Sequence, residues 1–274
     1  MTGLIDSHSH LDVADFDADR DAVLARASAA GVHRHIVPAI DAPGWPRLRA
    51  VCERAPGQLF PAYGLHPLYL DGHGPGHLDA LRDWLQRERA VAVGECGLDY
   101  FVEGLDRGRQ SEFFDAQLRI ARDFDLPVIV HSRRAVDAVI AAVRRIGGLR
   151  GVAHSFSGSR QQADMLIRQG FLLGVGGPVT YERANRLRTL AAELPLESLV
   201  LETDAPDQPD CRHRGERNEP CRLPFVAETV AALRGIDVAQ LARATTRNVE
   251  RLFGLEPAGP IGAGQGAPVS PRGT

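Results

Sequence analysis

The chain has 274 residues, 44% of them hydrophobic, so it can bury a full core either as one α/β barrel or as two smaller domains. Its formal net charge of −3 argues against a general polyanion binder, because nonspecific affinity for nucleic acid comes largely from summed Lys and Arg contacts with phosphate. The cysteines contain no C-x-x-C pair, so they suggest neither a zinc knuckle nor a disulfide framework, and a reducing compartment fits best. They are Cys52, Cys96, Cys211 and Cys221.

The sequence predicts neither a membrane span nor a leader. No stretch approaches the roughly 20 apolar residues that cross a bilayer, and the N-terminal segment carries the acidic Asp6 and no basic leader. We therefore expect a cytoplasmic protein. Residues 256–274 are rich in Gly, Pro and Ala, so they are predicted to form a disordered tail after a single domain that spans residues 1–255.

Short runs rich in Val, Ile and Leu alternate with stretches of helical period along the chain. In chain order, the predicted strands are Gly3–Ser7, His35–Ala39, Leu59–Gly64, Ala90–Gly94, Pro127–Val130, Gly151–Ala153, Phe171–Val175 and Ser198–Thr203. The clearest amphipathic helices between them are Arg20–Ala30, Gln110–Asp125 and Ala135–Ile146. Eight such alternations without a break in composition favour a (β/α)8 TIM barrel over two halves of a doubly wound sheet.

In a barrel of this kind, functional residues are expected at the C-terminal ends of the strands, where the βα loops form the active face. Strand alternation places His8 and His10 on one face, so both can contact one cation. The other candidates follow the fourth, fifth, sixth and eighth strands, and they are Glu95, His131, His154 and Asp204. A second H-x-H, His33 to His35, lies at the start of the second strand, and we assign it a structural role.

A single histidine is more often a hydrogen-bonded core or surface residue than a metal ligand, so only the six positions together predict a metal site. Four imidazoles and two carboxylates exceed what one tetrahedral metal needs and suit two metals with a bridging carboxylate, for which Glu95 is the candidate. The hypothesis gives one metal His8, His10, Glu95 and Asp204, and the other Glu95, His131 and His154. Asp204 is expected to orient a water and to accept its proton.

Five segments also carry a family resemblance. They read LIDSHSHLD at 4–12, GECGLDY at 94–100, PVIVHSRRAVD at 127–137, HSFSG at 154–158 and LVLETDAP at 199–206. In this order they resemble the TatD-type metal-dependent deoxyribonucleases of the amidohydrolase-like barrel superfamily, over nearly all of the predicted domain. One position departs from the pattern, since Ser155 stands where family members often have Cys, and metal binding should not change.

The resemblance implies a divalent-metal hydrolase of DNA that trims strands from the 3′ end, with the same six residues as ligands. Histidine-rich ligation favours Zn²⁺ or Mn²⁺, whereas the resemblance implies activity with Mg²⁺. Two alternatives stay open. The same dinuclear barrel could hydrolyse a cyclic amide or an aminoacyl ester, as in deacylation of D-aminoacyl-tRNA, or a silent barrel could bind only metal or a partner. No protein partner is required by the surface pattern.

Two residues at strand ends are predicted to contact substrate. Arg133 lies two residues beyond His131, so alternation puts its guanidinium on the same side, where it can bind phosphate. The alternative is a surface ion pair. His66 follows the third strand and could hold a phosphate or a leaving oxygen, or else hydrogen-bond Glu95 or a loop carbonyl.

The segment after the eighth strand, residues 210–222, is rich in arginine. A loop of this kind is usually only solvated, but here we expect a basic lip over the metals that contacts the DNA backbone, with Arg217 and Asn218 as substrate contacts. The family has a related Asn-Glu-Pro segment here, which suggests that Asn218 and Glu219 order the loop. Glu202 shares a strand face with Asp204 and is a predicted partner of a ligand histidine.

Overall fold

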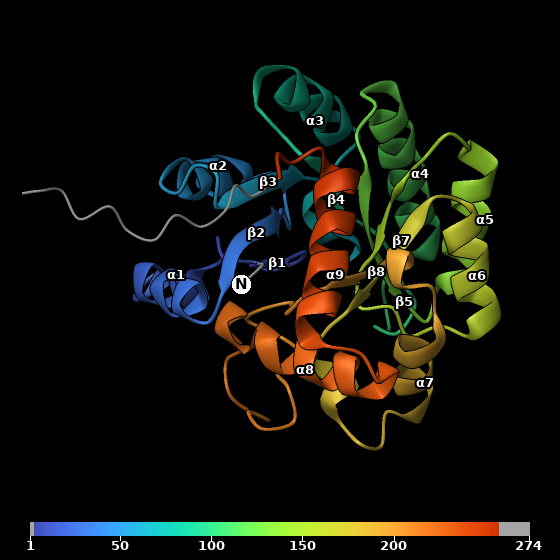
Figure 1. Cartoon of the computed structure of the whole chain (residues 1–274). Helices are drawn as coiled ribbons and strands as arrows, with labels where there is room; N and C mark the ends of the chain where they lie inside the picture. Colours follow the sequence, from blue (N-terminus) through green and yellow to red (C-terminus); the bar gives the residue numbers. More distant parts are fainter. Residues whose placement is uncertain (1–2, 258–274) are drawn as a thin grey trace, which may run out of the picture.

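The computed structural model describes residues 3–257, which form an eight-stranded parallel barrel surrounded by helices (Figure 1). The strands pair in sequence order from β1 to β8. They are β1 Leu4–Asp6, β2 Val32–Pro38, β3 Leu59–Tyr63, β4 Ala92–Asp99, β5 Val128–Arg133, β6 Gly151–Ala153, β7 Phe171–Val175 and β8 Leu199–Leu201. The predicted (β/α)8 architecture is confirmed.

Helices follow the strands and cover the outside of the barrel (Figure 1). The α-helices are α1 Arg20–Ala29, α2 Trp45–Glu53, α3 Gly76–Arg87, α4 Arg107–Asp123, α5 Val136–Ile146, α6 Arg160–Arg168, α7 Asn185–Glu193, α8 Leu223–Arg234 and α9 Val238–Phe253. Short 3-10 helices are η1 Ala14–Phe16, η2 Pro67–Gly72, η3 Gly177–Thr180, η4 Leu196–Ser198 and η5 Pro220–Arg222. Helix α4 begins three residues before the predicted start, because the Asp106 side chain caps it by accepting from the Arg109 N–H at 3.1 Å.

The barrel closes through segments that lie just beyond β8 and β1. The Ser7 N–H donates to the Leu201 carbonyl at 3.0 Å, and the Asp204 N–H donates to the His8 carbonyl at 2.8 Å. A further parallel bridge joins Ser9 to Ala205. Closure therefore brings the first and last segments of the barrel side by side, at the end where the strands finish.

The strand boundaries differ from the predicted ones at the strands that carry candidate ligands. Strands β4 and β5 run further than expected, so Glu95 and His131 lie within strands rather than after them. The extension has a pairing partner, because Gly97 is in register with His131 and Asp99 with Arg133. In contrast, β1 and β8 stop early, so His8, His10 and Asp204 lie beyond regular strand.

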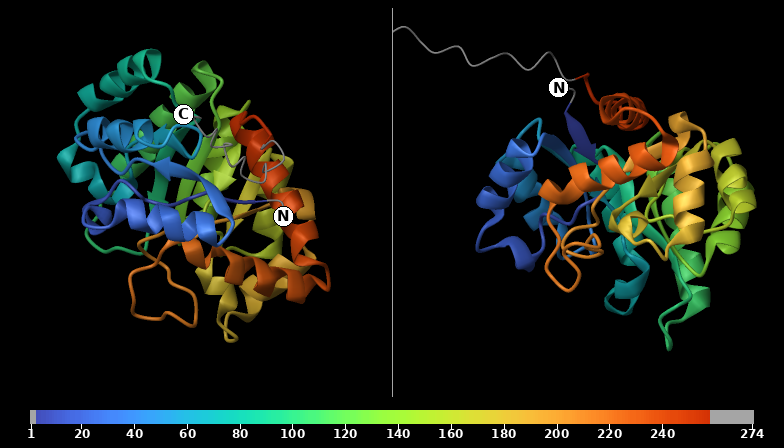
Figure 2. Two further views of the ribbon diagram at one scale, coloured as in Figure 1. Left: turned by 60° about the vertical axis from the view of Figure 1, so that its left-hand side comes forward. Right: turned by 60° about the horizontal axis from the view of Figure 1, so that its bottom comes forward.

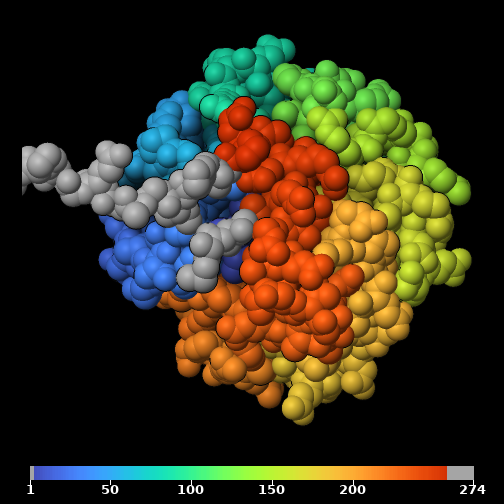
Figure 3. Space-filling model, viewed as in Figure 1, coloured from blue at the N-terminus to red at the C-terminus, as the bar shows by residue number. Residues whose placement is uncertain are grey.

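The N-terminal end of the barrel is closed by α9, which lies across it (Figure 3). An inner apolar cluster joins one or more residues of every strand to Val249, Leu252 and Phe253 of this helix. Arg34 of β2 forms an ion pair with Glu250 at the same end. A larger cluster lies between the strands and the surrounding helices. With this end closed, the cavity that the predicted ligands line opens at the C-terminal end of the barrel.

The H-x-H of β2 lies away from that cavity. His35 is buried, and its Nδ1 has no hydrogen-bond partner among residues 3–257, whereas Nδ1 of the partly buried His33 lies 3.3 Å from the Ser28 hydroxyl. Neither lines the cavity described below. Over the same residues, the structure contains no helix that is both long and apolar enough to cross a membrane. The predicted tail falls, except for Glu256 and Pro257, outside the described residues.

Candidate metal centre

A cavity of about 860 Å³ opens at the C-terminal end of the barrel. Figure 2 shows this end in its right-hand view, where loops that follow the strands extend away from α9. Most predicted site residues line the cavity, namely His10, His66, Glu95, His131, Arg133, His154 and Asp204. His8 is fully buried behind His10. The structure therefore brings together all six predicted ligands and two of the four predicted substrate contacts.

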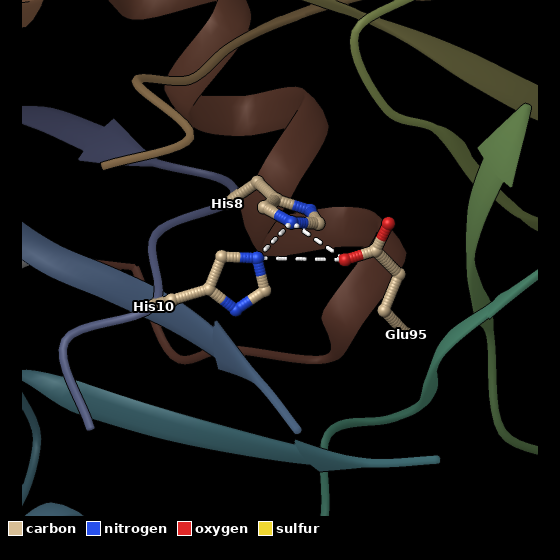
Figure 4. A group of neighbouring side chains, drawn as sticks. All are labelled: His8, His10 and Glu95. Carbon is tan, nitrogen blue, oxygen red and sulfur yellow. Dashed lines mark hydrogen bonds and ion pairs between the residues drawn. The ribbon is translucent and has the colours of Figure 1, made fainter. Parts of the chain in front are cut away.

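The first group, which we call the first site, contains His8, His10, Glu95 and Asp204. The Nε2 atoms of His8 and His10 lie 3.2 Å apart, and Glu95 Oε2 lies 3.1 and 3.5 Å from them (Figure 4). Asp204 Oδ1 lies 3.4 Å from His8 Nε2 and 3.6 Å from His10 Nε2. Four donor atoms from three separate elements thus converge on one point.

The second site uses the other oxygen of the same glutamate. Glu95 Oε1 lies 3.1 Å from His131 Nδ1 and 3.0 Å from His154 Nε2. The two ring nitrogens are 3.5 Å apart. His66 Nε2 also approaches Oε1, at 3.3 Å. Glu95 therefore lies between two clusters of imidazole nitrogen and presents one oxygen to each.

Hydrogen bonds on the far side of the rings point nitrogen lone pairs at these sites. His10 Nδ1 contacts the Pro38 carbonyl at 3.1 Å, and His131 Nε2 contacts Asp99 Oδ2 at 2.9 Å. Both partners accept hydrogen bonds and cannot donate them, so the proton of a neutral ring lies on these outer nitrogens. With a cation in place of the inner proton, the opposite nitrogen would present its lone pair to the metal. His154 Nδ1 makes no hydrogen bond among residues 3–257, and Glu202 Oε1 lies 3.7 Å from it, at ion-pair distance.

The donor set fits divalent cations. Lone pairs and carboxylate oxygens that face one another at 3.0 to 3.6 Å repel unless a positive charge lies between them. Ligands at about 2.1 Å from a tetrahedral cation are spaced by about 3.4 Å, which matches these separations. Imidazole suits zinc and manganese, whereas carboxylate suits magnesium and manganese. The arrangement can therefore hold metal.

Burial and neighbouring charge shift the acidity of the two carboxyls. Without metal, burial alone would raise the pKa of Glu95, but the positive charge on protonated imidazoles around it, His154 foremost, holds that pKa well below its usual value. Burial raises the pKa of Asp204 to about 6, against the lowering effect of His154 and His10. Burial also lowers the pKa of His66 to about 4. His66 is neutral at pH 7, and since its Nδ1 accepts from the Leu68 N–H at 3.2 Å, its proton lies on Nε2.

Two residues near the ligands were not anticipated from the sequence. Asp99 contacts His131 as described, and Gln208 donates a hydrogen bond to Asp204 Oδ2. The signal for Asp99 was its place four residues after Glu95, which puts both on one face once β4 is extended to Asp99. Gln208 lies in an irregular loop, where no periodicity predicts its direction.

Glycines make room for the contacts around the ligands. A Cβ on Gly174 would lie 2.1 Å from Glu202 Oε2, so this strand position must be glycine for Glu202 to reach His154. A Cβ on Gly97, where φ is +147°, would lie 2.0 Å from the His131 carbonyl. The predicted partnership of Glu202 with a ligand histidine matches the structure. The run Gly174 to Gly177 ends β7 and starts η3 as a close turn.

The arginine-rich segment is placed differently from the expected basic lip. Arg217 does not line the cavity, and its guanidinium donates to Asp19 Oδ1 and Oδ2 at 2.8 and 2.7 Å and to Glu219 Oε1 at 2.8 Å. The opposite charges of Asp19, the N-cap residue of α1, and of Glu219 thus draw Arg217 away from the metal centre. Asn218 is buried, and its Nδ2 donates to the Thr203 carbonyl at 2.8 Å, so it holds the loop that carries Asp204.

The fold and the site together define a metal-dependent hydrolase of the (β/α)8 barrel class. The family model described as TatD related DNase matches residues 5–254. The chain belongs to this family, and it is a metal-dependent, nuclease-like hydrolase of ester bonds.

Named relatives agree with this assignment. The chain is 42% identical over 254 residues to the uncharacterized metal-dependent hydrolase YjjV of Escherichia coli K12, covering 92% of this chain and 98% of the relative. It is 34% identical to the 3′-5′ ssDNA/RNA exonuclease TatD of Erwinia tasmaniensis, over 92% of this chain and 100% of the relative. The crystal structure of YjjV superimposes with a TM-score of 0.87 at 40% identity, over 92% of this chain and 98% of that one.

Proposed function

We propose that the protein is a 3′-to-5′ exodeoxyribonuclease that cleaves DNA with two divalent cations, Mg²⁺, Mn²⁺ or Zn²⁺. The observation that carries this proposal is the division of Glu95 between two clusters, with Oε2 facing His8 and His10 and Oε1 facing His131 and His154. A shared carboxylate of this kind suits a two-metal centre for phosphoryl transfer. The activity named for the Erwinia relative supports the direction of cleavage.

The site residues have separate roles in the proposed hydrolysis. The first site would hold one cation and the second site the other. When bound, the cations would lower the pKa of a water, which makes it a better nucleophile, and would offset negative charge on the phosphate oxygens. Asp204 orients the attacking water and accepts its proton, with its carboxylate fixed by Gln208. His66 lines the cavity, and its Nε2, which lies 3.3 Å from Glu95 Oε1, would donate to a phosphate or leaving oxygen in place of Glu95. Arg133 lines the cavity and offers a guanidinium to the next phosphate.

We also propose a cytoplasmic location, one domain over residues 1–255 and no obligate protein partner. The four cysteines are free thiols, which suits a reducing compartment. The family match over residues 5–254 supports a single domain.

The test is digestion of single-stranded DNA labelled at the 3′ or the 5′ end. The metal-loaded enzyme should release the 3′ label first, as mononucleotide. Asp204→Asn should slow release by at least about 100-fold, since it removes the proton acceptor. Metal analysis at saturating metal should still show both ions bound, because the amide oxygen and the three other donors of the first site remain. Asp83→Asn, which changes an exposed carboxylate on α3 that does not line the cavity, is the matched control and should keep activity.

Other outcomes would overturn the proposal. Intact DNA together with opening of a hydantoin or deacylation of a D-aminoacyl-tRNA would assign amide or aminoacyl-ester hydrolysis to the centre. No turnover of any of these substrates with Mg²⁺, Mn²⁺ or Zn²⁺ would leave a silent barrel.

A further inference from the structure

Exposed apolar side chains gather beside the candidate metal centre. Among residues 3–257, the large hydrophobic side chains that are exposed are Tyr69, Phe101, Val102 and Val238. Three of the four follow β3 or β4, at the end of the barrel that holds the cavity (Figure 2, right). Phe101 is 42% exposed, although it stands only two residues beyond Asp99, which contacts a predicted ligand.

Two guanidinium groups lie against the Phe101 ring. The Arg133 guanidinium carbon is 3.7 Å from the ring centroid, and that of Arg134 is 4.6 Å away. Consecutive residues of a strand point to opposite sides, but Arg134 has a φ of +54°, which breaks the alternation and lets both side chains reach one ring. Arg133 also lines the cavity, so the ring and the cavity share a neighbour.

The position of Phe101 is tied to that of the second site. Asp99 Oδ1 accepts from the N–H groups of Phe101 and Val102, at 2.9 and 3.0 Å, while Oδ2 of the same carboxylate contacts His131 at 2.9 Å. The Tyr100 N–H donates to the Arg133 carbonyl at 2.9 Å. One carboxylate therefore fixes both the backbone under the ring and a metal-facing imidazole.

We propose that Phe101 and Arg133 form a stacking platform for an unpaired nucleobase next to the scissile phosphate, an inference that rests on the proposed deoxyribonuclease function. An aromatic ring or a guanidinium plane stacks on the face of any base. Phe101 has no polar atom, so it reads no base edge and accepts all four bases. Inside a duplex, neighbouring base pairs cover both faces of each base, so the platform favours an unpaired base at the end of a single strand.

The experiment compares three variants of the full chain. Phe101→Ala removes the ring, Phe101→Trp retains a stacking surface, and Val102→Ala is a matched loss of an exposed apolar side chain in the same loop. Each is titrated, with Ca²⁺ in place of the activating ion, with strands that carry 2-aminopurine at one of the last three 3′ positions. Steady-state hydrolysis is then measured on an unmodified strand and on one with an abasic residue at the position that gave quenching.

The platform predicts that base fluorescence is quenched on binding to wild type, Phe101→Trp and Val102→Ala, and not to Phe101→Ala. Phe101→Ala should raise KM for the unmodified strand about tenfold with kcat within twofold. On the abasic strand, wild type and Phe101→Ala should have the same KM, because no base is left to stack.

Failure of the platform and failure of the proposed function give different results. Normal 3′ release by wild type, with unchanged KM and quenching in Phe101→Ala, would contradict the platform and leave the function standing. Ring-dependent quenching without any hydrolysis by wild type would support the platform and contradict the function. Absence of both binding and hydrolysis would contradict both.

Discussion

The position of the proton on each predicted ligand histidine determines which ring nitrogen can bind metal. Asp99 holds the proton of His131 on Nε2, and the Pro38 carbonyl holds that of His10 on Nδ1, so each ring has one nitrogen left for metal. His8 lacks such a partner within residues 3–257, where its Nδ1 makes no hydrogen bond. Its ring instead stacks on that of His154, with centroids 4.0 Å apart.

Asp99→Asn tests this orientation. The amide keeps the size of the carboxylate but loses its charge, so His131 should bind metal more weakly, by about 10- to 100-fold at the second site only. Titration of metal-free protein with Zn²⁺ against a chromophoric chelator measures both sites. Asp106→Asn, which changes a carboxylate that caps α4 in the same loop, is the control. Equal weakening at both sites, or none, would contradict the assigned role of Asp99.

At this scale, the six residues that the structure brings together could be predicted as a group because they follow apolar strand cores and match family segments. It did not predict Asp99, because the expected fourth strand stopped at Gly94 and its continued pairing with β5 depends on contacts distant in sequence. The direction of Arg217 also escaped prediction, since Asp19 lies 198 residues away along the chain. Tertiary contacts determine which of several distant charges a side chain pairs with, and local sequence patterns do not contain that information.

The loop 203–208 is the element on which the first site depends most. It carries Asp204 in a left-handed conformation, with a φ of +57°. Asn218 holds this loop, since its Nδ2 donates to the carbonyls of Thr203 and Asp207 at 2.8 and 2.9 Å and its backbone N–H donates to Pro206 at 2.9 Å. Asn218 is thus a positioning residue rather than a substrate contact.

Asn218→Ala should make the position of the Asp204 carboxylate less fixed. The change leaves buried carbonyls without donors, which should cost about 1 to 3 kcal/mol of unfolding free energy, measured by urea denaturation. A displaced carboxylate should also lower kcat on DNA by about 10- to 100-fold with KM little changed. Asn185→Ala removes an exposed asparagine at the start of α7 and should do neither. A rise in KM alone would instead indicate a direct contact of Asn218 with DNA.

Strand existence was predictable from apolar runs, whereas strand length was not. All eight predicted strands exist, yet β1 and β8 end earlier than predicted. Beyond their ends, the two chain segments run beside each other without regular strand pairing and are joined by single hydrogen bonds, such as that from the Asp204 N–H to the His8 carbonyl. Irregular backbone at this junction lets the Nε2 atoms of His8 and His10 approach to 3.2 Å.

For the whole molecule, the two ends of the barrel have separate tasks. Helix α9 and the pair Arg34 with Glu250 close the N-terminal end, while the C-terminal end holds every predicted ligand. The eightfold repeat predicted this division, because active residues of a (β/α)8 barrel lie after the strands. The sequence of α9 did not predict that this helix closes the barrel, because an amphipathic helix can pack on any apolar surface.

Acid stability of the molecule should depend on His35. Burial lowers its pKa to about 3, against 6.5 in an unfolded chain, so below pH 6.5 the unfolded chain binds a proton that the native state excludes. Stability is therefore full above pH 6.5 and falls as the pH drops towards 3. Between pH 7 and pH 5, this group should cost about 2 kcal/mol. Urea unfolding in chelator should show a shallower pH dependence for His35→Leu, and an identical dependence would contradict the account.

The most direct test of the two-site centre is the metal content of the chain, measured by elemental analysis after loading with Zn²⁺ and removal of excess. Wild type should hold two ions per chain, His131→Ala one, and Glu95→Gln fewer than one, because the bridging carboxylate serves both sites. One ion per wild-type chain, or two retained by Glu95→Gln, would contradict a centre bridged by Glu95.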